Sequence, residues 1–564
     1  MSEKSININE NTTVVPDEKK KVDKRDAKLS MAHLYVAFIA LFLGGLAGLL
    51  QVLVRSGSFT LPSGINYYQI LTVHGVLLGL ILTTFFIFGF QTAAMSKAVG
   101  TLSDKQRMLG WIGFWVMTVG TAMAAVMVLL NKASVLYTFY APLQAHWIFY
   151  AGLALVVVGS WIACLAEALR WIQWRKDNPK QRTPLLGFMI VCNNLMWFIA
   201  TIGVAAEVLL QLLPWSLGLI ERVDVLLTRT LFWSFGHALV YFWLLPAYMI
   251  WYTVVPKIIG GKIFSDALAR LSFIMFVLFS VPVGLHHQLT EPGISSSSKF
   301  LQVILTMMVV VPSLLTAFSL FATFEIRGRE LGGKGLFSWF KKMPWKDVRF
   351  FAPFIGMIAF IPGGAGGIVN ASNQMNQLIH NTIWVPGHFH LTVATGVVLT
   401  FFGATYWLVP HLTGRVLTKE MNRLGIIQTV LWALGMGIMS ISMHIAGLLG
   451  APRRSSFSDY GGAEIAKTWA SYQIGQAVGG TLLFVAILIF LYIFIKLRWS
   501  TTNKGFEEFP IAPVSEFAHE TPAILENFKV WIVILVALIL IAYTYPIYDI
   551  ISNAPLGSKG FKLW

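Results

Sequence analysis

Long apolar runs separated by short polar segments dominate the chain from residue 31 onward. A helix needs about 20 mostly apolar residues to cross a bilayer. Runs of suitable length lie near 31–54, 69–96, 108–130, 146–169, 185–213, 228–255, 270–289, 300–325, 350–370, 380–410, 424–450, 471–495 and 530–547. They predict an all-α integral membrane protein with about 13 transmembrane helices. The predicted transmembrane core covers 31–547, between a tail over 1–30 and a short external tail over 548–564.

Cationic residues are unequally divided between the two sides that these runs define. Of the 42 Lys and Arg residues, 32 fall on the side of the N-terminus and 10 on the opposite side. Positive residues gather on the cytoplasmic side of membrane proteins, so the N-terminus is predicted to be cytoplasmic and the C-terminus external. The net charge of +16 then faces the inner leaflet and does not indicate binding to nucleic acid. The predicted location is a prokaryotic cell membrane.

Composition narrows the possible chemistry. Hydrophobic residues make up 56% of the chain and charged residues 12%, a balance that requires lipid as the surrounding medium. The tail over 1–30 is too polar for a cleaved signal peptide and is predicted to be a disordered, basic cytoplasmic segment. Cys164 and Cys192 lie in separate apolar runs and form no motif. This argues against a cysteine-ligated copper or zinc site, an iron–sulfur cluster or a c-type haem within the chain.

Six histidines within the predicted helices share one layer of the bundle. They are His74, His237, His286, His287, His388 and His390. With alternating helix directions all six fall in the outer half, within about 5–15 Å of its edge. A polar side chain in the hydrocarbon region is costly, and a single one commonly has a hydrogen-bonding partner. Six of them from four helices in one layer favour a metal-binding role.

The spacing of these histidines indicates how many metals they bind. His388 and His390 are two residues apart and point about 200° away from each other on a helix, so they suit two flat cofactors on opposite sides. His286 and His287 are adjacent and can both reach one ion, with His237 as the natural third ligand. An all-imidazole site suits copper well and also suits zinc or iron. The sixth histidine then supplies a second axial ligand, which gives one bis-histidine haem, one mono-histidine haem and one tri-histidine metal.

Hydroxyl side chains form two stripes on the predicted helices. Tyr241 lies four residues after His237 on the same face, and Tyr248 and Tyr252 continue toward the cytoplasm. On another inward-running helix the stripe consists of Ser313, Thr316 and Ser319. Such hydroxyls commonly bond to the backbone of their own helix. Here both stripes lead from the cytoplasmic side to the predicted metal layer, which favours a proton path.

Three segments carry a family resemblance, namely GHALVYFWLLPAY at 236–248, GLHHQ at 284–288 and VPGHFHLTVATG at 385–396. Together they resemble the catalytic subunit of the haem–copper oxygen reductases, and specifically its B-type branch. The likeness covers nearly the whole chain, including the number of helices and the order of the ligands. It implies that the two hydroxyl stripes form the single K-type proton pathway of that branch.

The resemblance also implies a role for each histidine. His74 and His390 are expected to ligate a low-spin haem, and His388 the iron of a high-spin haem. A copper ion called CuB is expected on His237, His286 and His287. Tyr241 is expected to become covalently joined to His237, and to supply an electron and a proton when oxygen is reduced. The residues do not specify whether the haems are of type A, O or B.

Other positions match the family or depart from it. Leu239 stands where the A-type branch has a glutamate, so the second, D-type proton path is predicted to be absent. Arg453 and Arg454 match the arginine pair that binds haem propionates, for which charge-assisted bonds to carboxylates are suitable. His380 and Asn376 stand where relatives place a propionate-linked cluster. An asparagine at 376 is not expected to accept protons as an acid would.

The function that the resemblance implies is that of a terminal respiratory oxidase. Such a subunit reduces O₂ to water with electrons from cytochrome c, delivered through a subunit II that carries a copper site, and couples this reaction to proton uptake and pumping. Membrane lipid and small extra subunits are further expected partners. A quinol oxidase with the same core is the alternative, while a nitric oxide reductase would require a carboxylate near a non-haem iron and no tyrosine. A transporter with a histidine relay would not need six histidines in one layer. Glu207 is an ionisable intramembrane residue without an assigned role.

Overall fold

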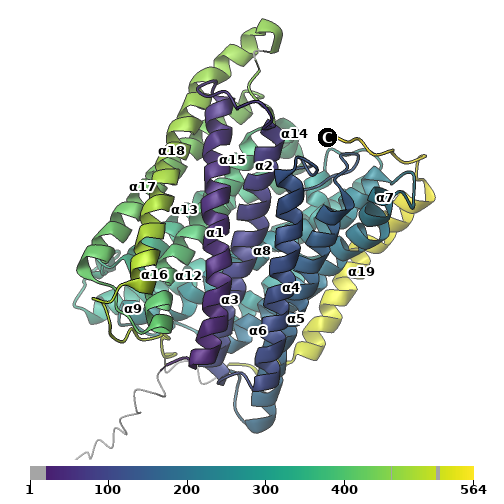
Figure 1. Ribbon diagram of the computed structural model, residues 1–564. Coiled ribbons are helices and arrows are strands. Elements are labelled where there is room, and N and C mark those ends of the chain that lie inside the picture. Colours follow the sequence, from purple (N-terminus) through teal and green to yellow (C-terminus); the bar gives the residue numbers. More distant parts are fainter. Residues whose placement is uncertain (1–20, 459, 516–520) are drawn as a thin grey trace, which may run out of the picture.

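The computed structural model describes residues 21–458, 460–515 and 521–564. In this part of the chain every regular element is a helix, and long helices run side by side in one bundle (Figure 1). Twelve helical segments within the described ranges are long and apolar enough to span a membrane. Those formed by one helix are α1 (Lys24–Arg55), α4 (Asp104–Leu129), α5 (Trp147–Asp177), α13 (Val348–Ala371), α17 (Lys419–Leu448), α18 (Glu464–Trp499) and α19 (Phe528–Ser552). Those formed by successive elements cover Tyr67–Val99, Leu185–Ser216, Val225–Ile258, Ser296–Glu330 and Trp384–Thr413.

The remaining predicted run, 270–289, is only partly helical. α10 (Asp266–Ser280) has 15 residues, and the chain continues through irregular backbone into the short 3₁₀ turn η4 (Gly284–Gln288). The helix alone is too short to span a bilayer, so the irregular segment completes the crossing. α1 begins at the lower end of the bundle in Figure 1 and the C-terminus lies at the upper end, as an odd number of crossings requires. The prediction of an all-α membrane protein with about 13 crossings is confirmed.

Both predicted tail boundaries need correction. The first helix begins at Lys24 rather than near 31, because Asp26 is buried and pairs with Arg107 of α4 at 2.7 Å. Residues 1–20, which make up most of the predicted disordered tail, lie outside the described residues. At the other end α19 extends to Ser552, beyond the predicted boundary at 547. The following segment is tied to the outer loops, since the Phe561 amide donates to the Pro142 carbonyl at 2.7 Å.

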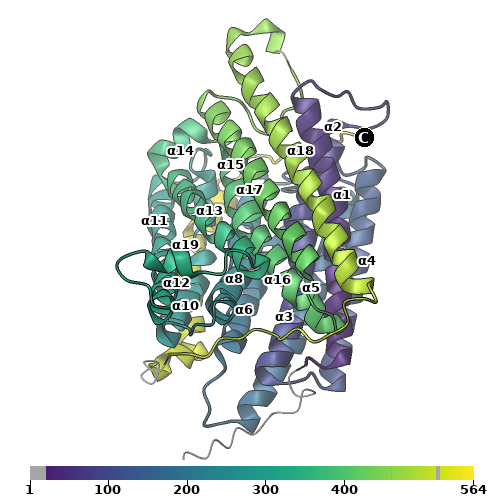
Figure 2. The ribbon, with the colours of Figure 1, turned by 90° about the vertical axis from the view of Figure 1, so that its left-hand side faces the viewer.

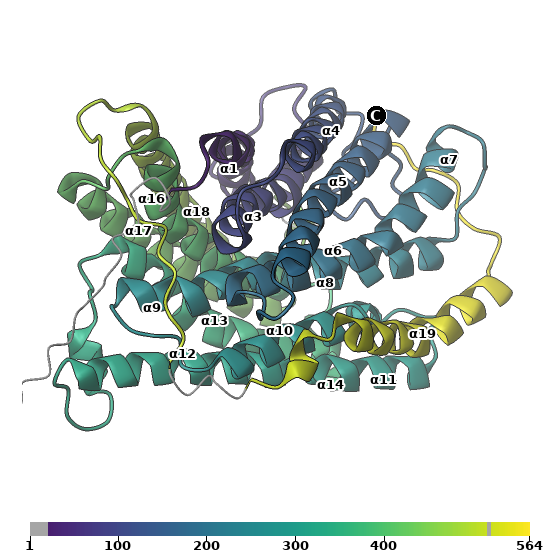
Figure 3. The same ribbon diagram turned by 90° about the horizontal axis from the view of Figure 1, so that it is seen from below.

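The two most buried spans both carry predicted ligands. The central windows of Trp384–Thr413 and Val225–Ile258 are 94% and 89% buried, against 22% for α19 at the edge of the bundle. Viewed from below, α8 (Val225–Thr253) runs between α6 (Leu185–Glu207) and α10 (Figure 3). The outer end of α18 projects above the rest of the bundle beside α17 (Figure 2). The deeply buried helices therefore position the site, and the peripheral ones face lipid.

Two predicted ligands adjoin π-helical turns. His74 lies in α2 (Tyr67–Gly75), which continues directly into the π-helical turn η2 (Val76–Leu82). His390 is the first residue of η6 (His390–Val397), which follows α15 (Trp384–Phe389). A π-helical turn inserts an extra residue and locally widens a helix, which is a frequent feature of functional sites.

Candidate metal and haem centre

Three histidines from two segments meet at one point in the outer half of the bundle. The ligand atoms of His237, His286 and His287 all lie within 4.8 Å of one another. His237 Nδ1 is 3.1 Å from His287 Nε2, and the rings of His237 and His286 are centred 4.4 Å apart. The adjacent histidines both face α8 because α10 ends before them and η4 turns the backbone. The donor set fits a copper ion, since all three ligands are imidazoles.

Neighbouring groups fix the orientation of two of these rings. His286 Nδ1 lies 2.6 Å from the Val283 carbonyl, so this nitrogen carries the proton and Nε2 is left free for a metal. The His287 ring stacks on the indole of Trp233, with centres 3.7 Å apart and planes 8° from parallel. Trp233 was not identified from the sequence, although its position four residues before His237 places it on the same helical face.

Tyr241 lies beside the first ligand of this cluster. Its ring centre is 4.9 Å from that of His237, with an angle of 63° between the planes. His237 Nε2 is buried and has no hydrogen-bond partner in the described part of the chain. A buried ring nitrogen without a partner is unfavourable, so a further bond to this atom would stabilise the site.

A second pair of histidines is arranged as axial ligands of one metal would be. The rings of His74 and His390 are 9° from parallel and their centres are 6.2 Å apart. Two metal–nitrogen bonds of about 2 Å each, together with the distance from each nitrogen to its ring centre, fill a gap of this size. His74 Nδ1 donates to the Gly44 carbonyl at 2.9 Å and His390 Nδ1 to the Pro386 carbonyl at 2.7 Å. Each ring thus keeps Nε2 as its free donor atom.

His388 faces different neighbours from His390. Its ring lies beside Trp384, with centres 6.0 Å apart and planes 16° from parallel. A Cβ atom on Gly366 of α13 would come within 2.7 Å of His388 Nδ1, so the close approach of the two helices requires glycine there. His388 Nδ1 is buried and unpaired in the described residues. The two histidines therefore serve separate spaces on either side of the helix, as their spacing predicts.

The four residues predicted to contact haem propionates gather at the outer rim. The Arg453 guanidinium donates to Asn381 Oδ1 at 2.8 Å, and His380 Nδ1 lies 3.0 Å from Asn376 Oδ1. Burial, followed by the charge of Arg454, lowers the pKa of Arg453 to about 10. Burial, followed by the charge of Arg453, lowers the pKa of His380 to about 4, so this imidazole is neutral at physiological pH. No carboxylate of the described chain forms an ion pair with either arginine, which fits binding of external carboxylates.

Tyr140 is a rim residue that the sequence did not reveal. The guanidiniums of Arg229 and Arg454 lie 5.0 Å and 5.3 Å from the centre of its ring. Its hydroxyl is buried without a partner in the described residues. Tyr140 belongs to the irregular connection between α4 and α5, where no periodic pattern relates it to the site. Arg229 could have been assigned to the site from the sequence, because it lies two turns before His237 on the same helix.

The two hydroxyl stripes meet between α8 and α12 (Val310–Glu330). The Tyr252 hydroxyl lies 3.0 Å from Thr316 Oγ1 and 3.5 Å from Ser272 Oγ of α10. Tyr248 interacts with Ser313 one turn further along the same two helices. The buried Ser319 hydroxyl lies on the other side of the Tyr252–Thr316 contact and interacts with Tyr252 as well.

Two further intramembrane residues lie apart from these stripes. Leu239 is buried at the position where the A-type branch has a glutamate. Glu207 ends α6 with both carboxylate oxygens buried and unpaired in the described residues. The structure therefore brings His237, His286 and His287 together with Tyr241, sets His74 against His390, and groups the rim residues and the hydroxyl stripes separately. Glu207 belongs to none of these groups.

Comparisons with known proteins agree with this architecture, which is that of a haem–copper oxidase. A family model described as "Cytochrome C and Quinol oxidase polypeptide I" matches residues 28–482. Cytochrome c oxidase subunit 1 of Thermus thermophilus is 40% identical over 558 residues, which cover 96% of this chain and 97% of that protein. Quinol oxidase subunit 1 of Bacillus spizizenii is 24% identical over 497 residues, 84% of this chain and 72% of that protein. A chain from a heme-copper terminal oxidase dimer, solved by cryo-EM, matches with a TM-score of 0.90, 36% identity and 95% coverage of both chains.

The chain belongs to the family of cytochrome c and quinol oxidase polypeptide I. It is the catalytic subunit of a terminal oxidase and a multi-pass protein of the plasma membrane. Membership implies haem and copper as cofactors and further subunits as partners. The predicted family resemblance, enzyme class and location are confirmed.

Proposed function

We propose that this chain reduces O₂ to water at a centre formed by a high-spin haem and CuB, with electrons that come from cytochrome c. The observation that carries the proposal is the cluster of His237, His286 and His287 beside Tyr241. Such a cluster combines three imidazoles that would hold a metal with a phenol beside one of them. The proposed route for the electrons is a partner subunit II that carries a copper site, which the name of the Thermus relative, cytochrome c oxidase subunit 1, supports.

The proposed cofactors are one low-spin haem, one high-spin haem and one copper ion. When bound, these groups supply the redox chemistry that breaks the O–O bond. His74 and His390 hold the low-spin haem from both sides, which their parallel rings support. His388 holds the high-spin haem on the opposite face of its helix. The three remaining histidines hold the copper, and the hydrogen bond from His286 Nδ1 to Val283 keeps that ring in the required tautomer.

Tyr241 acts as the hydrogen donor of the site. Its phenol gives up a proton and an electron during turnover. A bond from a ring carbon to His237 Nε2 holds it there; this bond replaces one C–H and one N–H bond, and the two electrons and two protons released go to O₂, the substrate of the site. The unpaired state of that nitrogen and the short distance between the two rings support this assignment. The phenol of Tyr241 beside the cluster disfavours a nitric oxide reductase, which would require a carboxylate there instead.

Protons reach Tyr241 from the cytoplasm along the two hydroxyl stripes. The contact of Tyr252 with Thr316 supports a connected path, because it joins the stripes of two different helices. Tyr248, Ser313 and Ser319 complete the path on either side of that contact. With Leu239 in place of an acid, protons for the reaction and for pumping share this single route.

The rim residues hold the propionates of the haems. Arg453 and Arg454 provide the charge, since both lack a carboxylate partner in the described chain, while His380 and Asn376 provide neutral hydrogen bonds. Asn376 holds His380 in place and does not exchange protons. Cytochrome c is favoured over quinol as the donor because the Thermus subunit, named for cytochrome c, is 40% identical, while the Bacillus spizizenii quinol oxidase is 24% identical.

An optical spectrum of the purified, reduced oxidase tests this proposal, recorded before and after addition of carbon monoxide. We expect sharp low-spin bands that do not change and a high-spin Soret band that shifts. Elemental analysis should find copper together with haem iron. Well-folded protein without haem absorption would refute the ligand assignment, and turnover with quinol in the absence of any cytochrome would replace the proposed donor.

A further inference from the structure

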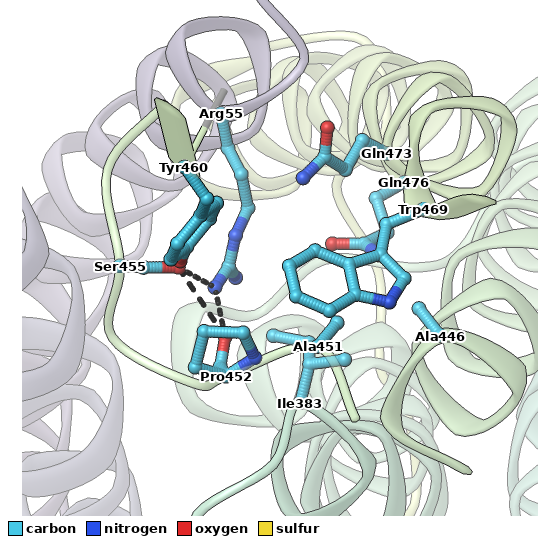
Figure 4. Close-up of a pocket in the computed structure, with 10 residues that line it drawn as sticks. All are labelled: Arg55, Ile383, Ala446, Ala451, Pro452, Ser455, Tyr460, Trp469, Gln473 and Gln476. Carbon is cyan, nitrogen blue, oxygen red and sulfur yellow. Dashed lines mark hydrogen bonds between the residues drawn. The ribbon is translucent and has the colours of Figure 1, made fainter. Parts of the chain in front are cut away.

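Arg55 reaches the rim from a helix that carries none of the predicted ligands. It is the last residue of α1, and its Nη2 donates to the Pro452 carbonyl at 2.9 Å and to Ser455 Oγ at 3.1 Å. Figure 4 shows its side chain extending between Tyr460 and the α18 residues toward Pro452. The two acceptors stand immediately before and immediately after the Arg453–Arg454 pair. One guanidinium therefore bonds to both ends of the segment that presents the pair.

The bonding partners of Arg55 are unusual for a buried cation. Its residue is 7% exposed, yet no carboxylate in the described part of the chain lies within ion-pair distance. Burial of a charged group is expensive unless polar partners compensate it. Here neutral acceptors provide the compensation, and a planar guanidinium suits two of them at once better than an ammonium group does.

A small pocket adjoins this guanidinium. Its volume is about 10 Å³, and its lining includes Arg55, Ser455, Trp469 and Gln476. Gln476 is 1% exposed, and its Oε1 has no hydrogen-bond partner in the described chain. A polar cavity of this size holds about one water molecule. A water bound there would accept a hydrogen bond from Arg55 and donate one to Gln476 Oε1, which otherwise has no partner in the described chain.

The opposite side of the segment is held by backbone bonds. The Ile383 amide donates to the Ala451 carbonyl at 2.8 Å, and the Arg453 amide donates to the Asn381 carbonyl at 3.0 Å. Arg454 has a φ of 66°, in the left-handed region that is unfavourable for a side chain of this kind. A backbone in that region persists where its surroundings hold it on several sides. The two hydrogen bonds from Arg55 hold the segment on the side that faces α1.

We propose that Arg55 is a positioning residue, which fixes the Pro452–Ser455 segment so that the Arg453 and Arg454 guanidiniums face the haem propionates. The inference rests on the proposed function, because it takes these two arginines as the propionate partners. Arg55 acts through them, and its removal should therefore be felt at the haem only while they are present.

The test compares Arg55→Lys and Arg55→Met with the wild type in the purified holo-oxidase, with the midpoint potential of the low-spin haem as the readout. When the rim cations move away from the propionates, the oxidised haem becomes relatively more stable. We expect the ratio of oxidised to reduced haem at a fixed potential to rise about tenfold in both variants, a shift of about 59 mV for one electron. Lysine should restore little of the loss, since it cannot hold both acceptors.

A double-variant cycle separates positioning from a direct effect. In an Arg453→Gln, Arg454→Gln background, Arg55→Met should cause no further shift, because the groups through which it acts are already absent. Ser455→Ala should give a smaller shift of the same sign and serves as a second variant if Arg55→Met does not fold. Arg498→Lys is the matched control, because that arginine bonds to Tyr35 at the inner end of α18 and should leave the potential unchanged.

Several outcomes would overturn the inference. An Arg55→Lys protein with wild-type potential would show that only the charge matters, and additive shifts in the double cycle would show that Arg55 acts on the haem directly. An unchanged potential in both single variants would refute any role. The wild-type spectrum is recorded first, so that an absence of haem there refutes the proposed function rather than the role of Arg55.

Discussion

The phenol of Tyr241 lies one helical turn from His237 on α8, with the two ring centres 4.9 Å apart. His237 Nε2 has no hydrogen-bond partner in the described chain. We expect Tyr241→Phe to retain both haems and copper, because none of the ligands changes. Oxygen reduction should fall by at least about a hundredfold, the usual range for loss of a positioned proton donor. Oxygen consumption, with metal content measured on the same sample, checks this.

A matched variant controls for the loss of a buried hydroxyl. Tyr406 is fully buried on α16 (Val398–Thr413) and bonds to Gln428 at 3.0 Å, far along its helix from the metal ligands. Tyr406→Phe should keep most of the activity. Normal turnover in Tyr241→Phe would remove the phenol from the mechanism.

His390 faces His74 in a parallel arrangement that leaves one free nitrogen on each ring. We expect His390→Ala to lose the sharp low-spin bands while the band that responds to carbon monoxide stays. The haem content per chain should fall by about half, since an axial ligand is part of what retains a haem. The pyridine haemochrome assay and the reduced spectrum together measure both changes.

His444 offers the comparison for this variant. It lies on α17 near Trp384, with ring centres 4.8 Å apart, and its Nδ1 donates to the Ser440 carbonyl of its own helix. His444→Ala should retain both sets of bands. A loss of the carbon monoxide response in His390→Ala, with the low-spin bands intact, would exchange the roles assigned to His388 and His390.

Thr316 joins the two hydroxyl stripes through its 3.0 Å contact with Tyr252. Thr316→Val keeps the shape of the side chain but removes the cross-helix hydrogen bond. We expect steady-state turnover to fall about tenfold or more, because proton delivery becomes limiting. Electron transfer from donor to the low-spin haem should stay at its wild-type rate, which stopped-flow reduction measures.

Thr405→Val is a suitable control because Thr405 is also buried and bonds to the backbone of its own helix, donating to the Phe401 carbonyl at 2.8 Å. This change should leave turnover close to that of the wild type. Equal slowing in the two valine variants would mean that Thr316 contributes to packing only.

The site could be predicted from sequence where local periodicity carries the information. His237, Tyr241, the His388–His390 pair and the stripes of α8 and α12 all follow helical spacing, whereas His286 and His287 are adjacent in the 3₁₀ turn η4. Three features could not be predicted from the sequence, because they depend on contacts between distant segments. Tyr140 sits in an irregular loop, Arg55 acts across 397 residues on Pro452, and Asp26 is drawn into α1 by Arg107. The break in α10 also escaped, since apolar residues continue past Ser280 after the helical geometry has ended.

Glu207 is the remaining ionisable group, fully buried at the end of α6 with both oxygens unpaired in the described residues. A buried carboxylate without partners is unfavourable, so Glu207→Leu should stabilise the folded protein by about 1 kcal/mol. Glu167 is the matched control: it is also buried, but it accepts hydrogen bonds from Asn194 at 2.7 Å and Gln91 at 3.2 Å, so Glu167→Leu should destabilise the fold. The buried thiols of Cys164 and Cys192 report unfolding through their reaction with a thiol dye on heating.

Turnover of Glu207→Leu should remain near the wild-type value, because no contact joins this residue to the Tyr252–Thr316 path. A variant that keeps both haems but loses proton uptake would instead place Glu207 in the proton-transfer machinery.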